Sequence, residues 1–145
     1  MSWAVGNGLI SGIASDGADY LAPSGAMKTG WTLVDGSWYY LDGSGAMRTG
    51  WLALQGTWYY LDSSGAMKTG WLSLGPSSYY LSDSGAMQTG WKKIDDDWYC
   101  FASSGTRLNN CWVGNYYLEG NGMMARNKWI GTYYVGEDGC WIPGY

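Results

Sequence analysis

Hydrophobic and polar positions follow a fixed pattern along most of the chain. The tripeptide Gly-Ala-Met recurs every 20 residues, and each copy is followed by Thr-Gly-Trp and then by a second aromatic cluster. The Trp of the Thr-Gly-Trp motif is found at Trp31, Trp51, Trp71 and Trp91. Because this spacing is held through four units, the pattern predicts an internal repeat.

Each repeat has room for one hairpin and a connection. In the first unit, segments 31–34 and 38–41 are rich in strand-forming residues, and the turn residues Asp35-Gly36-Ser37 lie between them. A lone two-stranded hairpin is only marginally stable in water, so we expect successive hairpins to stack. The predicted fold class is all-β, a solenoid of stacked β-hairpins.

The two ends depart from the regular pattern. We predict an atypical cap over residues 1–24, regular repeats over 25–104, and shortened repeats with a cap over 105–145. Trp112 and Trp129 are 17 residues apart, because the hairpin turn is shorter there.

Composition excludes several classes of function. The 145 residues include 11 Trp, 13 Tyr and 24 Gly but no His, which excludes Ser-His-Asp and Cys-His catalysis and His-ligated metals. The net charge is −4 and the basic residues are scattered, which argues against nucleic acid. No apolar run is long enough to insert in a membrane, and the first residues lack the pattern of a signal peptide.

Other candidate chemistry is sparse. Cys100, Cys111 and Cys140 are an odd number, which leaves a Cys100–Cys111 pair and free thiols as alternatives. The acidic run 95–97 aligns with a hairpin turn and is interpreted as solvated rather than metal-binding. The remaining carboxylates lie in turns or in irregular units, so we predict a non-catalytic module without metal or cofactor.

The aromatic pairs are the strongest candidates for binding. Alternation places Trp38 and Tyr40 on one face of a strand and Tyr39 on the other. Trp and Tyr faces without a nearby carboxylate suit a quaternary ammonium group, although a sugar ring could also stack on Trp. Packing alone would accept Phe, yet Phe occurs only once, as Phe101, so the Trp and Tyr set favours contact with a polar ligand.

These motifs resemble a known repeat. Thr-Gly-Trp, Trp-Tyr-Tyr-Leu and Gly-Ala-Met are similar to the choline-binding, or cell-wall-binding, repeat of autolysins, phage endolysins and Gram-positive surface proteins, closely over 25–101 and loosely over 105–145. The resemblance implies a left-handed superhelix in which choline of teichoic acid lies between consecutive repeats. Two Trp of one repeat, a Tyr of the next and a Met would enclose it. Glucan-binding domains and clostridial toxin repeats are similar relatives, which keeps a glucan as the alternative partner.

Carried over to this chain, the resemblance implies unequal choline sites. They comprise Trp31, Trp38 and Tyr60; Trp51, Trp58 and Tyr80; and, in a shifted register, Trp91, Trp98 and Tyr117. The second Tyr of each pair is chosen because it shares a strand face with the Trp, and Tyr59 and Tyr79 replace Tyr60 and Tyr80 if the first Tyr is the one that faces the site. Met47 and Met67 are candidate apolar walls, with gap-filling as the alternative.

Two regions weaken the pattern. At the third junction Trp71 remains, but Ser78 replaces the second Trp and Cys100 replaces the Tyr, so we expect an empty or weak site. The shortened hairpins at Trp112 and Trp129 have no second Trp, which weakens the case for a box there.

The N-terminal segment carries a partial resemblance of its own. Residues 3–12 with 21–23 are similar to the later part of an S-layer homology motif, but the Thr-Arg-Ala sequence that normally follows is missing. No binding function is carried over from it, and an irregular cap is the alternative.

Together these observations predict an extracellular, cell-wall-associated module that binds choline-substituted teichoic acid or choline analogues. A glucan-binding module and a structural scaffold with decayed sites are the alternatives. The missing signal peptide fits a lysin fragment, an excised segment or a leader further upstream, and the sequence leaves the oligomeric state open.

Overall fold

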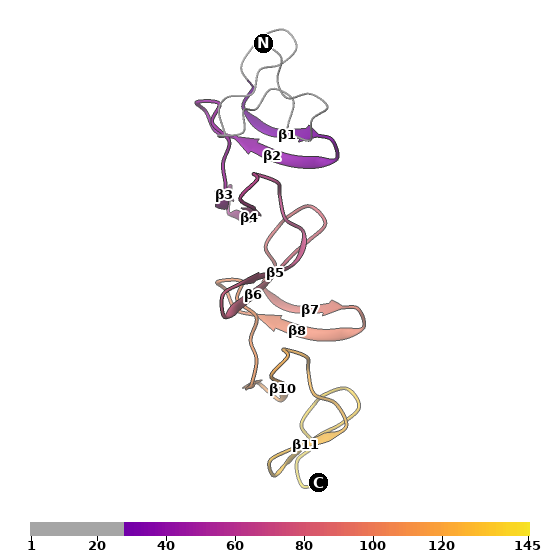
Figure 1. Ribbon diagram of the computed structural model, residues 1–145. Helices are drawn as coiled ribbons and strands as arrows, with labels where there is room; N and C mark the ends of the chain where they lie inside the picture. Colours follow the sequence, from indigo (N-terminus) through magenta and orange to yellow (C-terminus); the bar gives the residue numbers. More distant parts are fainter. Residues whose placement is uncertain (1–27) are drawn as a thin grey trace. The chain divides into compact units, whose positions relative to one another are not determined.

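The computed structural model describes residues 28–145, so the predicted cap over residues 1–24 and its S-layer-like segment lie outside the described residues. Within that range the regular structure is entirely β-strand, arranged in two-stranded antiparallel sheets of consecutive strands (Figure 1). The all-β class, built from successive hairpins, is therefore confirmed. The strands are β1 (Gly30–Val34), β2 (Ser37–Leu41), β3 (Gly50–Leu54), β4 (Thr57–Leu61), β5 (Gly70–Leu74), β6 (Ser77–Leu81), β7 (Gly90–Ile94), β8 (Asp97–Phe101), β9 (Cys111–Val113), β10 (Tyr116–Leu118), β11 (Lys128–Ile130) and β12 (Tyr133–Val135).

The hairpin turns are tighter than the sequence suggested. Asp35 and Gly36 alone connect β1 to β2, with φ of 51° and 82°, whereas Ser37 already pairs with Val34. Positive φ at both central residues is the signature of a type I′ turn, whose twist matches that of the flanking strands. This turn sets the register in which Trp31 lies opposite Tyr40.

A carboxylate organises the loop that follows each of the first two hairpins. Asp42 accepts hydrogen bonds from the backbone N–H groups of Ser44 at 2.9 Å and Ala46 at 3.0 Å, and from the Ser44 hydroxyl at 2.6 Å. The loop then returns to the hairpin, where Met47 forms a bridge with Leu41. Asp62 holds the next loop in the same way.

The buried core is a series of small clusters. The last residue of the second strand is fully buried in hairpin after hairpin, namely at Leu41, Leu61, Leu81, Leu118 and Val135. Leu41, for example, packs against Val34, Tyr39 and Met47. Between residues 28 and 145 the Trp residues lie outside these clusters and remain partly exposed, as at Trp38 (41%) and Trp98 (39%). Aliphatic residues therefore supply much of the core, and the indole rings are left available.

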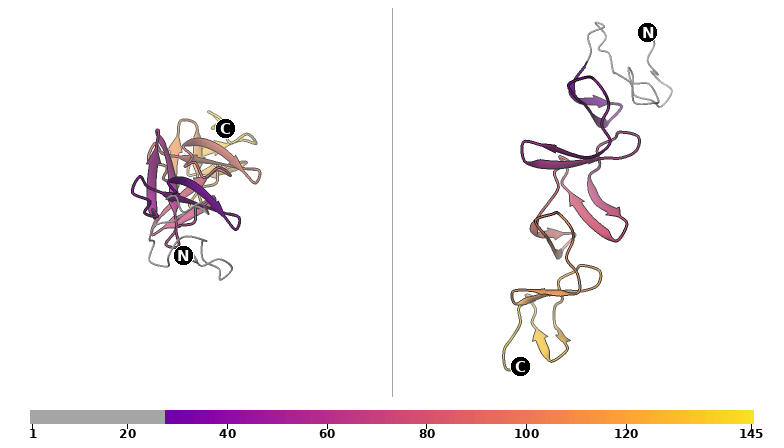
Figure 2. Two further views of the ribbon diagram at one scale, coloured as in Figure 1. Left: turned by 90° about the horizontal axis from the view of Figure 1, so that it is seen from above. Right: turned by 90° about the vertical axis from the view of Figure 1, so that its left-hand side faces the viewer.

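The described chain divides into two compact units. One contains residues 28–70 and 81–87, and the other contains 71–80 and 88–145. Within each unit, loops rather than further strands link one hairpin to the next (Figure 2). In the first unit the Met67 N–H donates to the Trp38 carbonyl at 2.8 Å, and in the second the Met124 N–H donates to the Trp98 carbonyl at 2.8 Å. Each such bond ties a hairpin to the loop that follows its successor. The left-handed superhelix stays a prediction.

The remaining sequence features are simple. Cys100, Cys111 and Cys140 are free thiols, so of the two alternatives the structure has the unpaired one. Burial raises the pKa of the Cys100 thiol, and the neighbouring Cys111 adds to this effect. Two residues of the acidic run, Asp95 and Asp96, form a turn. Between residues 28 and 145 there is no helix of the length and apolarity that a membrane span needs.

Candidate aromatic binding sites

The first pocket is built by three consecutive repeats. Trp31 comes from β1, Trp38 from β2, and Tyr59 from β4 of the next hairpin. Met67, from the loop after β4, lies beside Trp38 because its N–H binds the Trp38 carbonyl. The loop after β6 adds Asp83 and Ser84 at the rim, and the pocket has a volume of about 320 Å³.

Its aromatic rings form a corner. The ring centroids of Trp31 and Trp38 are 6.5 Å apart with an interplanar angle of 88°, so the two indoles stand at right angles. Tyr59 closes a further side, with its ring centroid 5.0 Å from that of Trp31 and an angle of 70°. The three rings therefore bound one shared space from different directions.

Tyr59, rather than Tyr60, is the residue that the structure brings to Trp31 and Trp38. Tyr60 instead packs on Trp51 of its own hairpin, at 5.1 Å and 72°, because the register places these two residues directly opposite each other. The two members of a Tyr pair point to opposite faces of the hairpin. One hairpin's Trp face meets the opposite face of its successor, so this pocket is lined by Tyr59, the alternative that the sequence left open, and not by the first choice, Tyr60.

The second Trp pair has the same corner geometry. Trp51 and Trp58 are 6.3 Å apart at 85°, and the Met87 N–H donates to the Trp58 carbonyl at 2.8 Å. Tyr80, which the sequence assigned to this pair, packs on Trp71 of its own hairpin at 5.2 Å and 72°.

The third junction is altered as its sequence suggests. Trp71 contacts Tyr99 at 4.9 Å and Phe101 at 5.8 Å, but Ser78 offers no second indole. Arg107 stands in the place of the Met, since its N–H donates to the Ser78 carbonyl at 2.8 Å. A cationic side chain at this position opposes the binding of a cationic ligand, a point that the alignment of Thr106-Arg107 with Ala-Met could have revealed.

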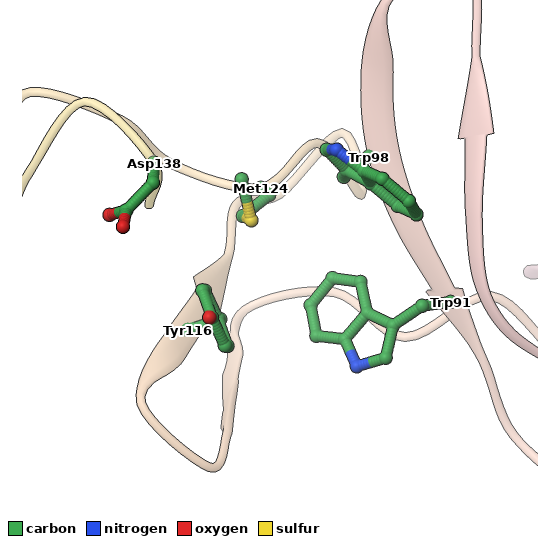
Figure 3. A pocket seen from close by; sticks show the side chains of 5 residues that line it. All are labelled: Trp91, Trp98, Tyr116, Met124 and Asp138. Atoms are coloured by element: carbon green, nitrogen blue, oxygen red, sulfur yellow. The ribbon is translucent and has the colours of Figure 1, made fainter. Parts of the chain in front are cut away.

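The fourth pocket repeats the first in the second unit (Figure 3). Trp91 from β7 and Trp98 from β8 lie on one side, Tyr116 from β10 lies opposite, and Met124 lies between them at the edge, in a pocket of about 340 Å³. The ring centroids of Trp91 and Tyr116 are 5.6 Å apart. The predicted Tyr117 again packs on its own hairpin, 5.2 Å from Trp112.

A pocket that the sequence did not assign lies further along the second unit. Trp112, Tyr133 and Trp141 line it together with Gly114 and Asn115. Trp129, in contrast, packs with Tyr134 and Tyr145 near the C-terminus.

Carboxylates lie nearer to the rings than the sequence suggested. Asp83 lines the first pocket and Asp138 the fourth, and both side chains belong to exposed loop residues. In Figure 3 Asp138 lies beyond Met124 and Tyr116 as seen from the two Trp. These residues were missed because each comes from a loop two hairpins further along, a proximity that the 20-residue spacing alone does not reveal.

Met residues line both pockets. Met67 lines the first and Met124 the fourth, and Met47, a predicted wall, packs against the buried Leu41. Across residues 28–145 no group of three or more His, Cys, Asp or Glu side chains is placed to hold a metal ion.

Comparison with known families and structures agrees with this geometry. Choline-binding repeat families match residues 28–71, 48–89 and 106–141, and a cell wall binding repeat matches 89–106. No curated protein matches the chain.

Solved structures give the same assignment. Choline-binding protein F of Streptococcus pneumoniae is 43% identical with a TM-score of 0.79, over 85% of this chain and 43% of that one. CbpJ of Streptococcus pneumoniae TIGR4 is 45% identical with a TM-score of 0.80, over 86% of this chain and 44% of that one.

The choline-binding domain of Spr1274 from Streptococcus pneumoniae is 36% identical with a TM-score of 0.50, over 61% of this chain and 99% of that one. The chain spans less than half the length of choline-binding protein F and CbpJ. With repeat matches from residue 28 to residue 141 and a corner of Trp rings in both the β1–β2 and the β3–β4 hairpin, the chain belongs to the choline-binding repeat family.

Proposed function

We propose that this chain is a non-catalytic, extracellular module that anchors to the bacterial cell wall by binding choline groups of teichoic acid. The observation that carries the proposal is the recurrence of one pocket in both units. Trp31, Trp38, Tyr59 and Met67 line the first pocket, and the equivalent four residues line the fourth.

The chemistry of these pockets suits a trimethylammonium group. Such a cation is weakly hydrated, cannot be satisfied by a hydrogen bond, and is attracted to the faces of aromatic rings. Each ring contributes roughly 0.5–2 kcal/mol, so three rings support affinity of about millimolar strength at one pocket. The thioether of Met67 or Met124 offers an apolar, polarisable wall to the methyl groups.

The charge around the pockets favours the same ligand. Asp83 and Asp138 place a carboxylate at the rim of the first and fourth pockets. Both side chains are exposed, so each adds a modest attraction for cations that salt screens.

Structures of a relative support a ligand of this class. Choline-binding protein F has been solved in complex with ipratropium, a choline analogue, and in the presence of a peptidoglycan analogue. Several weak pockets on one chain would bind a polymer that carries many choline groups by avidity, which suits attachment to a wall.

A glucan is the second candidate ligand. Its supporting observation is the exposure of indoles such as those of Trp112 (37%) and Trp58 (44%), on which sugar rings could stack. Perpendicular Trp walls fit a compact head group better than a flat pyranose ring, so we place choline first.

A titration separates these possibilities. Choline chloride is added while Trp fluorescence and melting temperature are followed, with sodium chloride at equal ionic strength as the control. We expect a saturable response at millimolar choline that Trp38→Ala weakens and Trp129→Ala preserves, because Trp129 is not among the residues that line the described pockets. A response to glucan oligosaccharides but not to choline would favour the second candidate, and no response to either would leave the scaffold alternative.

A further inference from the structure

The pocket lined by Trp112, Gly114, Asn115, Tyr133 and Trp141, here called the C-terminal pocket, lies outside the regular repeats. It is formed by β9 and the turn that follows it, the start of β12 and the loop after β12. Its volume is about 350 Å³, close to the 340 Å³ of the fourth pocket. The shortened β9–β10 hairpin has no second Trp, so a ring from another segment must supply any further aromatic wall.

Backbone hydrogen bonds show which positions are equivalent in the two pockets. The Trp141 N–H donates to the Asn115 carbonyl at 2.8 Å, as the Met124 N–H donates to the Trp98 carbonyl at 2.8 Å. Asn115 therefore takes the place of Trp98, and Trp141 takes the place of Met124. Compared with the fourth pocket, the C-terminal pocket has a non-aromatic residue where the second Trp would be and a Trp where the Met would be. Both pockets therefore have three aromatic rings.

The three rings enclose a shared space. The ring centroid of Tyr133 lies 5.8 Å from that of Trp112 and 5.9 Å from that of Trp141, with interplanar angles of 82° and 83°. Tyr133 thus stands nearly perpendicular to both indoles. Trp112 and Tyr133 are 37% and 50% exposed, so a ligand can reach the rings from solvent.

We propose that the C-terminal pocket is a further binding site for a trimethylammonium group. In it, Trp141 supplies the second indole wall that Trp98 supplies in the fourth pocket. This inference rests on the proposed function. It assigns a site to the region where the sequence pattern breaks down.

The lining residues also set the selectivity of the pocket. The first and fourth pockets include Asp83 and Asp138, whereas the residues that line the C-terminal pocket are all uncharged. Its attraction for a cation therefore comes from ring faces alone. The uncharged tert-butyl isostere of choline, 3,3-dimethylbutan-1-ol, should lose less affinity here than at the fourth pocket.

Indole N–H signals of the ¹⁵N-labelled full chain test the site directly by NMR. During a choline chloride titration we expect the signals of Trp112 and Trp141 to shift saturably in the millimolar range, as do those of Trp91 and Trp98. Trp141→Met introduces the residue found at the equivalent position of the fourth pocket, and it should weaken the Trp112 response by about 2- to 30-fold, the worth of one ring. Trp91 and Trp98 should keep the wild-type curve.

Controls separate loss of binding from loss of folding. Trp129→Met alters a neighbouring Trp outside the pocket and should leave the Trp112 response intact, and an unchanged melting temperature should show that Trp141→Met folds. Tyr133→Leu is a second variant that removes a ring from the opposite side of the pocket, and it too should weaken the Trp112 response.

Distinct results would overturn the inference. If Trp91 and Trp98 respond to choline while Trp112 and Trp141 do not, this site is refuted and the proposed function stands. If no indole responds, both fail. An equal ratio of isostere to choline affinity at the fourth and C-terminal pockets would refute the argument from charge.

Discussion

The two members of each Tyr pair have different environments. Tyr59 contacts Trp31 of the preceding hairpin and lines the first pocket, whereas Tyr60 contacts Trp51 of its own hairpin. Adjacent residues of one strand point to opposite faces, so chemically identical side chains acquire distinct roles.

This division predicts that two neighbouring substitutions affect different properties, one ligand binding and the other stability. Tyr59→Leu removes one ring from the first pocket and should weaken choline binding there by about 2- to 30-fold. Tyr60→Leu removes a ring that supports Trp51 and should lower the free energy of unfolding by about 1–3 kcal/mol, while the first pocket keeps its affinity. Choline titration of the Trp38 signal and denaturant unfolding measure the two effects. Loss of binding in Tyr60→Leu alone would contradict the assignment.

Sequence reasoning identified the Trp residues and left the choice within each Tyr pair open, with Tyr60 as the first choice and Tyr59 as the alternative. Period-two alternation correctly places Trp58 and Tyr60 on one face of the hairpin. It carries no information on which face of the next hairpin meets that surface, and this packing choice decides between Tyr59 and Tyr60.

The free thiols should differ in reactivity. Cys100 is buried, and burial raises the pKa of its thiol, whereas Cys111 and Cys140 are partly exposed. Because the thiolate is the reactive form, Cys100 should react more slowly with DTNB at pH 8 than either of the others. Single Cys→Ser variants identify each phase of the reaction, and a fast phase that Cys100→Ser removes would contradict the described burial.

At the level of the element, hairpin and loop are each organised by local chemistry. Turn residues in the sequence located the regular hairpins. In the first two, the Asp-Gly and Gln-Gly pairs accept the positive φ values of the turn, and in the fourth Asp95 and Asp96 adopt them. The boundaries of the first hairpin differ by one residue in each strand. The two-residue turn lets pairing begin at Ser37, and the ladder extends to Gly30, which pairs with Leu41.

The loops should make stability depend on pH. Partial burial raises the pKa of Asp62, but hydrogen bonds from Ser64 and Ala66 outweigh it, so the net pKa lies below the ordinary value of 3.8. A carboxyl whose pKa is lowered by folding contributes stability above its unfolded pKa, and this is lost as pH falls through the folded value. The hydrogen bonds of the ionised Asp62 should therefore stabilise the fold at pH 7 and weaken below pH 3.8.

Asp62→Ser tests this account with a residue that the chain already uses. Ser82 occupies the equivalent position and accepts a hydrogen bond from the Ala86 N–H at 3.2 Å. At pH 7 the free energy of unfolding of the variant should be lower than that of the wild type by about 1 kcal/mol or less. This difference should shrink at pH 3. Urea unfolding at both pH values measures it, and a difference that grows on acidification would show the opposite sign.

At the scale of the whole chain, repetition was predictable and its exceptions were less so. The 20-residue spacing located the hairpins, and the loss of the second Trp at Ser78 was read directly. The contributions of Asp83, Asp138 and Trp141 were not found, because these residues reach their pockets from loops well beyond the hairpin that supplies the Trp.

Several pockets on one chain should produce avidity. A surface that carries many choline groups should bind the chain about 10²- to 10⁴-fold more tightly than free choline does, provided that two or more pockets engage it together. Surface plasmon resonance on choline-coated and uncoated chips measures this gain. The double variant Trp38→Ala, Trp98→Ala should show a much smaller gain in affinity. Equal binding of the wild-type chain to coated and uncoated chips would contradict specific binding.

The most direct test of the central claim is a crystal structure of the chain at saturating choline. The aromatic pockets are predicted to hold the trimethylammonium group between Trp31, Trp38 and Tyr59, and between Trp91, Trp98 and Tyr116. Choline bound away from these rings, or both pockets empty at saturation, would contradict the account.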